Sequence, residues 1–227
     1  MLPIMSLFSK KKQPESIPVE EVNTDNSSTI SEVIEIDDSY LLTSPQVVGW
    51  LSTQEQELLF SAMLLFYKPE HSILDVGCGR ADLYGYLQNI FPAAYIKYNG
   101  IDYNPNAISL AQRKFPTATL ESVDILKIDK GADYDWVVGS GLFNLKDPDG
   151  DLLSYAKNVV DVMFDKAKLG VSFNLLTGTP EDMADEDKDL LFEHNHSEWL
   201  DFLIKRYGKV IARADYMLGD ITFYILK

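Results

Sequence analysis

The sequence predicts an α/β domain in which a mostly parallel sheet carries helices on both of its faces. Three observations lead to this prediction. Short apolar segments alternate with helical patterns, a glycine turn joins the first such pair at residues 75–82, and the last two apolar segments are separated by only a short turn. Alternating strands and helices are typical of parallel sheets, because each parallel crossover needs a helix. The final pair must be antiparallel, since so short a turn permits no crossover.

The chain divides by composition into an acidic tail and a body that can fill a core. Its 227 residues, 46% of them hydrophobic, fit one large domain after the tail. Residues 1–40 are rich in Ser, Thr, Glu, Pro and Asn and hold eight acidic residues against three lysines. Such a segment cannot bury enough apolar surface to fold by itself, so we expect a disordered tail over 1–40 and a folded domain over 41–227.

The expected elements follow in order along the body. Ser52-Thr-Gln-Glu55 has the capping-box pattern, and apolar residues then recur at helical spacing until Pro69, which should end the helix. We expect strands near residues 73–77, 95–102, 119–124, 135–140 and 170–176. A long helix is expected near 151–168 and another near 197–206. Two strands within 209–217 and 221–226 should close the sheet.

The segment from Asp75 to Asp82, Asp-Val-Gly-Cys-Gly-Arg-Ala-Asp, predicts a tight turn from strand to helix. Its glycines allow the backbone to approach a ligand closely, and the helix start offers free N–H groups. A dinucleotide fingerprint needs a small residue where Asp82 stands, and a carboxylate there would repel a pyrophosphate by about 1 kcal/mol or more. No Gly-Lys-Ser/Thr triplet of a P-loop occurs. Asp75 and Asp82 instead favour a phosphate-free, positively charged cofactor such as S-adenosylmethionine.

The segment Ile73-Leu-Asp-Val-Gly-Cys-Gly79 resembles motif I of the class I S-adenosylmethionine-dependent methyltransferases, and later segments resemble the other motifs of that family in order. The resemblance covers about residues 43 to 227, with Ala81 at the usual third glycine. It implies a Rossmann-like seven-stranded sheet of order 3-2-1-4-5-7-6, with strand 7 antiparallel. Segments around Trp50, Ser140–Asn144 and 172–177 are also similar to a poorly characterised bacterial and phage subgroup of the family.

The resemblance implies a set of cofactor-binding residues. In this family the acid after the second strand binds the ribose hydroxyls, and the acid after the third meets the adenine amino group. The corresponding set here is Asp75, Gly77, Cys78, Gly79, Asp82, Asp102, Tyr103, Asp124, Ile125, Ser140 and Gly141. The spacing from Gly77 to Asp102 independently fits a ribose-binding acid, which belongs roughly 20 residues beyond the glycine turn. The alternative for Asp102 is a helix N-cap.

Three residues are candidates for a catalytic role. Phe143-Asn144 follows the fourth expected strand, and Phe173-Asn174 repeats the pair in the fifth. Asn144 either orients a substrate or caps its loop. His194 and His196 end an acidic segment over 178–196, and each is either a general base or an ordinary surface histidine. No convincing set of metal ligands appears, so no metal is expected.

Composition restricts the classes of substrate and partner that the protein can bind. The formal net charge is −15 and no basic stripe is present, which argues against a nucleic-acid substrate. No apolar run reaches the length of a membrane span, and the single cysteine, Cys78, fits a reducing compartment. We therefore expect a cytoplasmic protein that acts on a small molecule.

The function predicted from the sequence is S-adenosylmethionine-dependent methyl transfer to a small or medium-sized O- or N-nucleophile. The alternative is a catalytically silent module of the same fold that docks on a protein partner through its N-terminal tail. The glycines of the turn and Asp102 favour cofactor binding over the silent module, although they leave turnover open.

Overall fold

The computed structural model describes residues 38–45, 49–50, 52–129, 131–146, 150–179, 181, 183 and 185–227. Residues 1–37 of the predicted disordered tail lie outside the described residues. The described chain begins with helix α1 (Asp38–Thr43), which takes in the last residues assigned to the tail.

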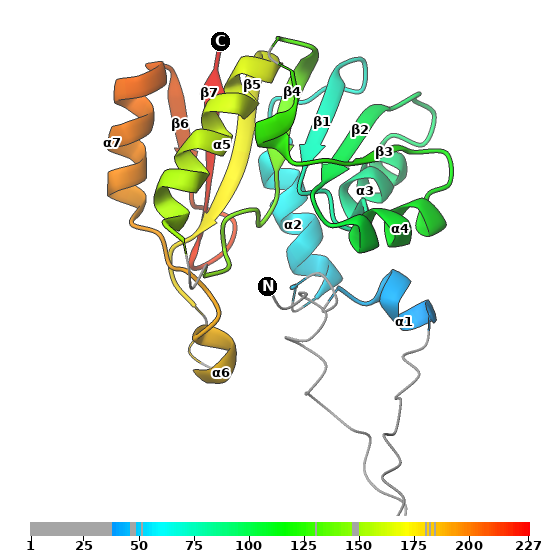
Figure 1. Cartoon of the computed structure of the whole chain (residues 1–227), viewed down its shortest axis with the longest axis horizontal. Helices are drawn as coiled ribbons and strands as arrows, with labels where there is room; N and C mark the ends of the chain where they lie inside the picture. The colour runs from blue at the N-terminus through cyan, green and yellow to red at the C-terminus, as the bar shows by residue number, and fades with distance from the viewer. Residues whose placement is uncertain are drawn as a thin grey trace, which may run out of the picture.

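A single seven-stranded sheet forms the centre of the molecule (Figure 1). Its order is β3-β2-β1-β4-β5-β7-β6, and β7 pairs antiparallel with both β5 and β6. The predicted order and the antiparallel last strand are therefore confirmed. The strands are β1 (Ser72–Val76), β2 (Lys97–Asp102), β3 (Thr119–Ser122), β4 (Tyr134–Gly139), β5 (Ala167–Leu176), β6 (Val210–Arg213) and β7 (Asp220–Leu226).

Helices cover both faces of the sheet, as predicted. They are α2 (Thr53–Met63), α3 (Asp82–Ile90), α4 (Pro105–Lys114), α5 (Leu152–Lys166), α6 (Asp185–Lys188), α7 (His196–Tyr207) and the short 3₁₀ helix η3 (Ile125–Lys127). In β4, Val137 packs into one hydrophobic cluster, with α5 and α7, while Trp136 and Val138 pack into another, with α2 and α3. A strand buried on both faces explains why β4 reads as a continuous apolar run.

Two predicted boundaries differ most from the structure. Ser52 caps α2 by accepting a hydrogen bond from the Glu55 N–H, as predicted, but α2 ends at Met63 rather than at Pro69. After Met63 the chain turns, with the Tyr67 N–H bonded to the Leu64 carbonyl, and both side chains stay in the core without helical backbone. The sixth strand is also shorter than predicted, because pairing with β7 stops at Arg213.

The parallel strands all end at one edge of the sheet, where α1 and α6 also lie (Figure 1). Among the described residues, no helix combines the length and apolar character needed to cross a membrane. The carboxyl edge of the parallel strands is where open α/β sheets bind ligands, and it carries the predicted site residues.

We expect Gly100→Ala to destabilise the fold. Gly100 lies opposite Asp75 in the β1–β2 pairing, and a methyl group there would come within 2.9 Å of the Cys78 sulfur and the Tyr98 hydroxyl. Overpacking of this kind costs about 1–3 kcal/mol, which chemical denaturation can measure. The control is Gly178→Ala, where the nearest atom would be 3.8 Å away. Equal stability changes in the two variants would contradict the close packing at Gly100.

Candidate cofactor site

The turn after β1 is held in a conformation that suits glycine. Gly77 and Gly79 have φ angles of 67° and 53°, in the left-handed region, and Ala81 shares it with a φ of 58°. A side chain at Gly77 would come within 2.6 Å of Leu142, from the loop after β4. Ala81, at the third glycine position of the motif, thus keeps a left-handed backbone despite its methyl group, at a cost of about 1–2 kcal/mol.

Asp102 joins the end of β2 to this turn. Its Oδ2 accepts a hydrogen bond from the Gly79 N–H at 3.0 Å, and its Oδ1 accepts one from the Asn104 N–H at 2.8 Å. The N-cap of α4 is Asn104, so the alternative interpretation of Asp102 as the cap is wrong. The structure thus brings the predicted ribose-binding acid directly against the glycine turn.

Asp75 is buried beneath the turn, with 2% of its surface exposed. It accepts a hydrogen bond from the Tyr98 hydroxyl at 2.7 Å. Burial raises the pKa of Asp75 to about 7, the Tyr98 hydrogen bond opposes this, and the charges of Asp102 and Asp82 add to it. Tyr98 has no recognisable signal in the sequence, because only the parallel register of Ile73 with Tyr98 brings its ring under Asp75.

Cys78 occupies the turn as a small buried residue. Its backbone N–H binds the Ile101 carbonyl at 3.0 Å, which is a second link between the turn and β2. Burial, together with the charges of Asp75 and Asp102, raises the pKa of the Cys78 thiol far above its ordinary value. Since the thiolate is the nucleophilic form, the thiol is inert, in line with its interpretation as a turn residue.

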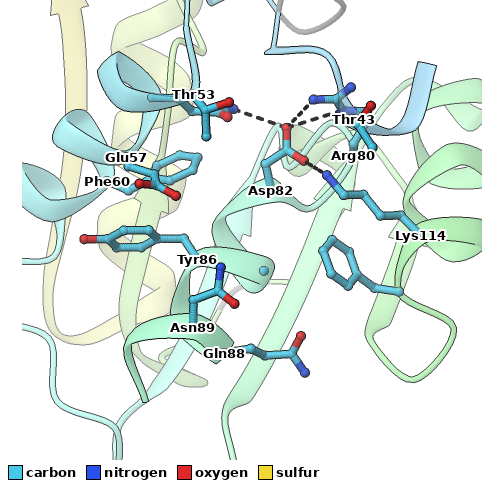
Figure 2. Close-up of a pocket in the computed structure, with 13 residues that line it drawn as sticks. Thr43, Thr53, Glu57, Phe60, Arg80, Asp82, Tyr86, Gln88, Asn89 and Lys114 are labelled. Atoms are coloured by element: carbon cyan, nitrogen blue, oxygen red, sulfur yellow. Dashed lines mark hydrogen bonds and ion pairs between the residues drawn. The ribbon is translucent and has the colours of Figure 1, made fainter. Parts of the chain in front are cut away.

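The predicted role of Asp82 in attracting a cationic cofactor needs correction. Arg80 Nη2 approaches the Asp82 carboxylate to 2.8 Å and Lys114 Nζ to 2.5 Å. Gln56 donates a further hydrogen bond to it at 3.2 Å. These two cations lower the pKa of Asp82 against the opposing effect of burial and compensate its charge. Its carboxylate lines a pocket of about 250 Å³ between α2, α3 and the end of α4 (Figure 2).

Arg80, which the sequence analysis did not single out, ties the N-terminal segment to the turn. It is 2% exposed, and its Nη1 donates to the carbonyl oxygens of Leu41 at 2.8 Å and Ser44 at 2.7 Å. With Asp82 on its other edge, the guanidinium has both charge and hydrogen-bond partners in the core. The end of α1 is thereby anchored beside the start of α3.

The adenine side of the predicted site is more open. Tyr103 is 59% exposed at the end of β2, and Asp124 caps η3 by accepting a hydrogen bond from the Leu126 N–H at 3.0 Å. The Ile125 side chain packs in the core and is 5% exposed. The sequence analysis did not single out Tyr155, on α5. Burial raises the pKa of Tyr155, and the charges of Asp124 and Asp102 raise it further.

The Phe-Asn pairs of the sequence form reciprocal contacts between the loop after β4 and β5. Asn174 Oδ1 accepts from the Gly141 N–H at 2.7 Å, and Asn144 Oδ1 accepts from the Leu176 N–H at 3.1 Å. The rings of Phe143 and Phe173 meet edge-on at 6.0 Å beneath them. The Asn144 oxygen thus fixes its loop, which supports the structural interpretation of this residue.

The two candidate histidines lie in different environments. His194 is buried: its Nε2 lies 2.9 Å from the Phe143 carbonyl, and its Nδ1 accepts from the Trp199 indole N–H at 3.1 Å. Burial lowers the pKa of His194, so it is a neutral structural residue. His196 is exposed at the first residue of α7. Among the residues that the structure describes, no group of three potential ligands could hold a metal ion.

The edge fits a cationic nucleoside cofactor on two counts. Ser140 Oγ is buried and has no hydrogen-bond partner among the described residues, and such an atom normally meets a ligand or water. The hydrogen bonds found for Asp75 and Asp102 come from neutral donors, whereas Asp82 is already compensated by Arg80 and Lys114. Asp102 therefore supplies negative charge at the glycine turn without a neighbouring cation among the described residues, whereas the raised pKa of Asp75 leaves that carboxyl partly protonated near pH 7.

We expect Asp75→Asn to remove one component of the pH dependence of stability. Between the ordinary pKa of 3.8 and the folded value of about 7, native Asp75 binds more protons than unfolded Asp75. The free energy of unfolding of the unmodified protein should therefore fall across this window, relative to the variant, and level off above it. The fall should be on the order of 2–4 kcal/mol in denaturation curves. Parallel curves for the two proteins would contradict the raised pKa.

We expect Arg80→Ala to loosen the N-terminal segment. The variant leaves Asp82 with one cation and removes the donors to Leu41 and Ser44, so the free energy of unfolding should fall by about 3–5 kcal/mol. Hydrogen exchange over residues 38–45 should become faster. The control is Arg206→Ala, an exposed arginine paired with Asp161, which should cost less than about 1 kcal/mol. Unchanged exchange over 38–45 would show that Arg80 does not anchor α1.

Comparison with known proteins agrees with this geometry. Residues 73–163 match the family model of a methyltransferase domain, which covers β1 to most of α5. A search of the curated proteins found no match.

Solved structures share the fold. Magnesium protoporphyrin IX methyltransferase from Synechocystis PCC 6803, with bound S-adenosylmethionine, has a TM-score of 0.55 and 12% identity over 86% of this chain and 99% of its own. DesVI from Streptomyces venezuelae has a TM-score of 0.58 and 15% identity over 85% and 99%. A possible exported protein from Bordetella parapertussis has a TM-score of 0.58 and 19% identity over 81% and 69%.

At these identities the solved structures establish the fold alone, and the family match adds the identity of the domain. Residues 73–163 therefore match a methyltransferase domain, and the seven-stranded sheet around them has the strand order that the resemblance to class I S-adenosylmethionine-dependent methyltransferases implied.

Proposed function

We propose that the chain binds S-adenosylmethionine at the carboxyl edge of β1, β2 and β4 and transfers its methyl group to a small or medium-sized O- or N-nucleophile. The observation that carries this proposal is the bond from the Gly79 N–H to Asp102, which fixes a carboxylate beside a left-handed glycine turn. A carboxylate there can accept from two neighbouring ribose hydroxyls.

The remaining contacts follow from the order of the elements. Asp124 would meet the adenine amino group, with the exposed ring of Tyr103 against the adenine face. Ser140 and Gly141 would hold the methionine part, where the unpartnered Ser140 hydroxyl can bond to its polar groups. When bound, the cofactor supplies an electrophilic methyl group on a sulfonium ion.

The residues of this chain would act mainly by placement. His194 has both ring nitrogens engaged, and the Asn144 oxygen accepts a hydrogen bond from the Leu176 N–H of β5. Holding nucleophile and methyl group at the right distance and angle can itself contribute about 7–11 kcal/mol to lowering the barrier. We therefore propose a reaction in which alignment, rather than a strong general base, supplies most of the acceleration.

A small-molecule acceptor fits this chain better than a nucleic acid. The magnesium protoporphyrin methyltransferase shares the fold over nearly its whole length, and its name specifies a porphyrin substrate. The net charge of −15 opposes a nucleic-acid acceptor here. A protein partner of the N-terminal tail remains a prediction from composition.

Calorimetry with S-adenosylhomocysteine tests the proposal. The unmodified protein should bind it, and Asp102→Asn should bind about 10- to 100-fold more weakly, because a charge-assisted hydrogen bond to the ribose is lost. The control is Asp201→Asn, an exposed residue of α7 paired with Lys205, which should leave affinity unchanged.

Absence of binding to the unmodified protein would defeat the methyltransferase proposal and favour a silent docking module. Binding without transfer from methyl-labelled S-adenosylmethionine to any component of a fractionated cell extract would defeat turnover alone.

A further inference from the structure

A chain of buried hydrogen bonds runs from the β6–β7 turn to the loop after β4. The Tyr216 hydroxyl donates to Asp220 Oδ1, Asn174 Nδ2 donates to Asp220 Oδ2 at 2.8 Å, and the Gly141 N–H donates to Asn174 Oδ1 at 2.7 Å. Asn174 is fully buried and Asp220 is 3% exposed. The sequence analysis offered no role for Asp220 or Tyr216.

The sheet register explains why the chain of bonds reaches the site. β4 ends at Gly139, which lies opposite Phe173 of β5, so Asn174 extends just beyond the end of β4. On its other side β5 pairs with β7, whose first residue is Asp220. Asn174 is therefore the link between β7 and the loop that carries Ser140 and Gly141.

The carboxylate sets the direction of the amide. An ionised carboxylate only accepts hydrogen bonds, so it holds the Asn174 NH₂ group toward itself and leaves the Asn174 oxygen facing Gly141. A reversed amide would set its NH₂ group against the Gly141 N–H. Gly141 has a φ of 62°, so this bond holds a left-handed turn next to the unpartnered Ser140 hydroxyl.

We propose that Asp220 is a positioning residue of the methyl-transfer site, acting through Asn174 to hold the Ser140–Gly141 turn where the methionine part of the cofactor binds. This inference rests on the proposed function, because it assigns the turn to cofactor contact. Asp220 itself lies one side chain removed from the turn.

Few ionisable groups face this network. Tyr216 and Asn174 are the side chains found bonded to Asp220, and Tyr216 also meets the Thr222 hydroxyl at 2.7 Å. Burial raises the pKa of Asp220, and these two hydrogen bonds oppose the rise. His194 also lies at the end of β5, but its ring bonds to the Phe143 carbonyl and to Trp199.

The sharpest test is Asn174→Asp, which makes cofactor affinity depend on pH. The introduced carboxyl faces Asp220, and the pair can keep its mutual hydrogen bond only while it shares a proton. The measured quantity is the affinity of the variant for S-adenosylhomocysteine divided by that of the unmodified protein at the same pH. We expect this ratio to be near one at pH about 6 and to fall about tenfold by pH about 9. The matched control is Asn158→Asp on the exposed side of α5, whose ratio should stay constant.

Variants of Asp220 separate positioning from simple stabilisation. Asp220→Ala removes the acceptor of Asn174 Nδ2 and should weaken binding about five- to tenfold. Asp220→Asn should restore most of the affinity, because its oxygen can accept from Asn174 and its amide can donate to Tyr216. Amide exchange at Gly141, followed by NMR, should quicken in Asp220→Ala and recover in Asp220→Asn, which gives a readout should Asn174→Asp fail to fold.

The outcomes distinguish the two proposals. If the unmodified protein binds no S-adenosylhomocysteine, the proposed function fails and this inference fails with it. If the unmodified protein binds, but Asp220→Ala loses only thermal stability and keeps both affinity and slow Gly141 exchange, the positioning role alone is overturned. A constant ratio across pH in folded Asn174→Asp would overturn it as well.

Discussion

The hydrogen bond from the Gly79 N–H to Asp102 organises the whole carboxyl edge of the sheet. It fixes the turn after β1 against the end of β2, and the Cys78 N–H adds a second link to the Ile101 carbonyl. The turn donates both bonds, and Gly77 and Gly79 on either side of Cys78 adopt left-handed backbone without a side-chain penalty. The start of α3 and the position of Asp102 both follow from this constraint.

The negative charges of Asp82 and Asp75, which both lie near the glycine turn, are balanced in different ways. Asp82 carries its own counterions, Arg80 and Lys114, and Arg80 uses its remaining donors to hold the end of α1. Asp75 has a phenol as its partner instead of a cation, so burial raises its pKa to about 7. Asp82, which the sequence analysis interpreted as attracting a cationic cofactor, is thus the acid whose negative charge is most fully compensated by neighbouring cations.

The second half of the site depends on a loop held from two sides. Asn144 binds the backbone of β5, Asn174 binds the backbone of the loop, and Asp220 of β7 orients the Asn174 amide. The antiparallel strand β7, which lies between β5 and the edge strand β6, thereby also supports the loop after β4. The pairing of β7 with β5 therefore also determines the geometry of this loop.

The sequence by itself determined the alternation of strands and helices, the antiparallel last pair and the glycine turn, because these follow from local hydrophobic period and glycine placement. The strand order came from the resemblance to the methyltransferase family. The sequence also identified Asp102, since the acid lies at a fixed distance after the turn. Only the tertiary structure decided which partners the acids meet: Tyr98 for Asp75, Arg80 and Lys114 for Asp82, Asn174 for Asp220. Those contacts depend on strand register and helix packing between residues far apart in the chain, which no local pattern encodes.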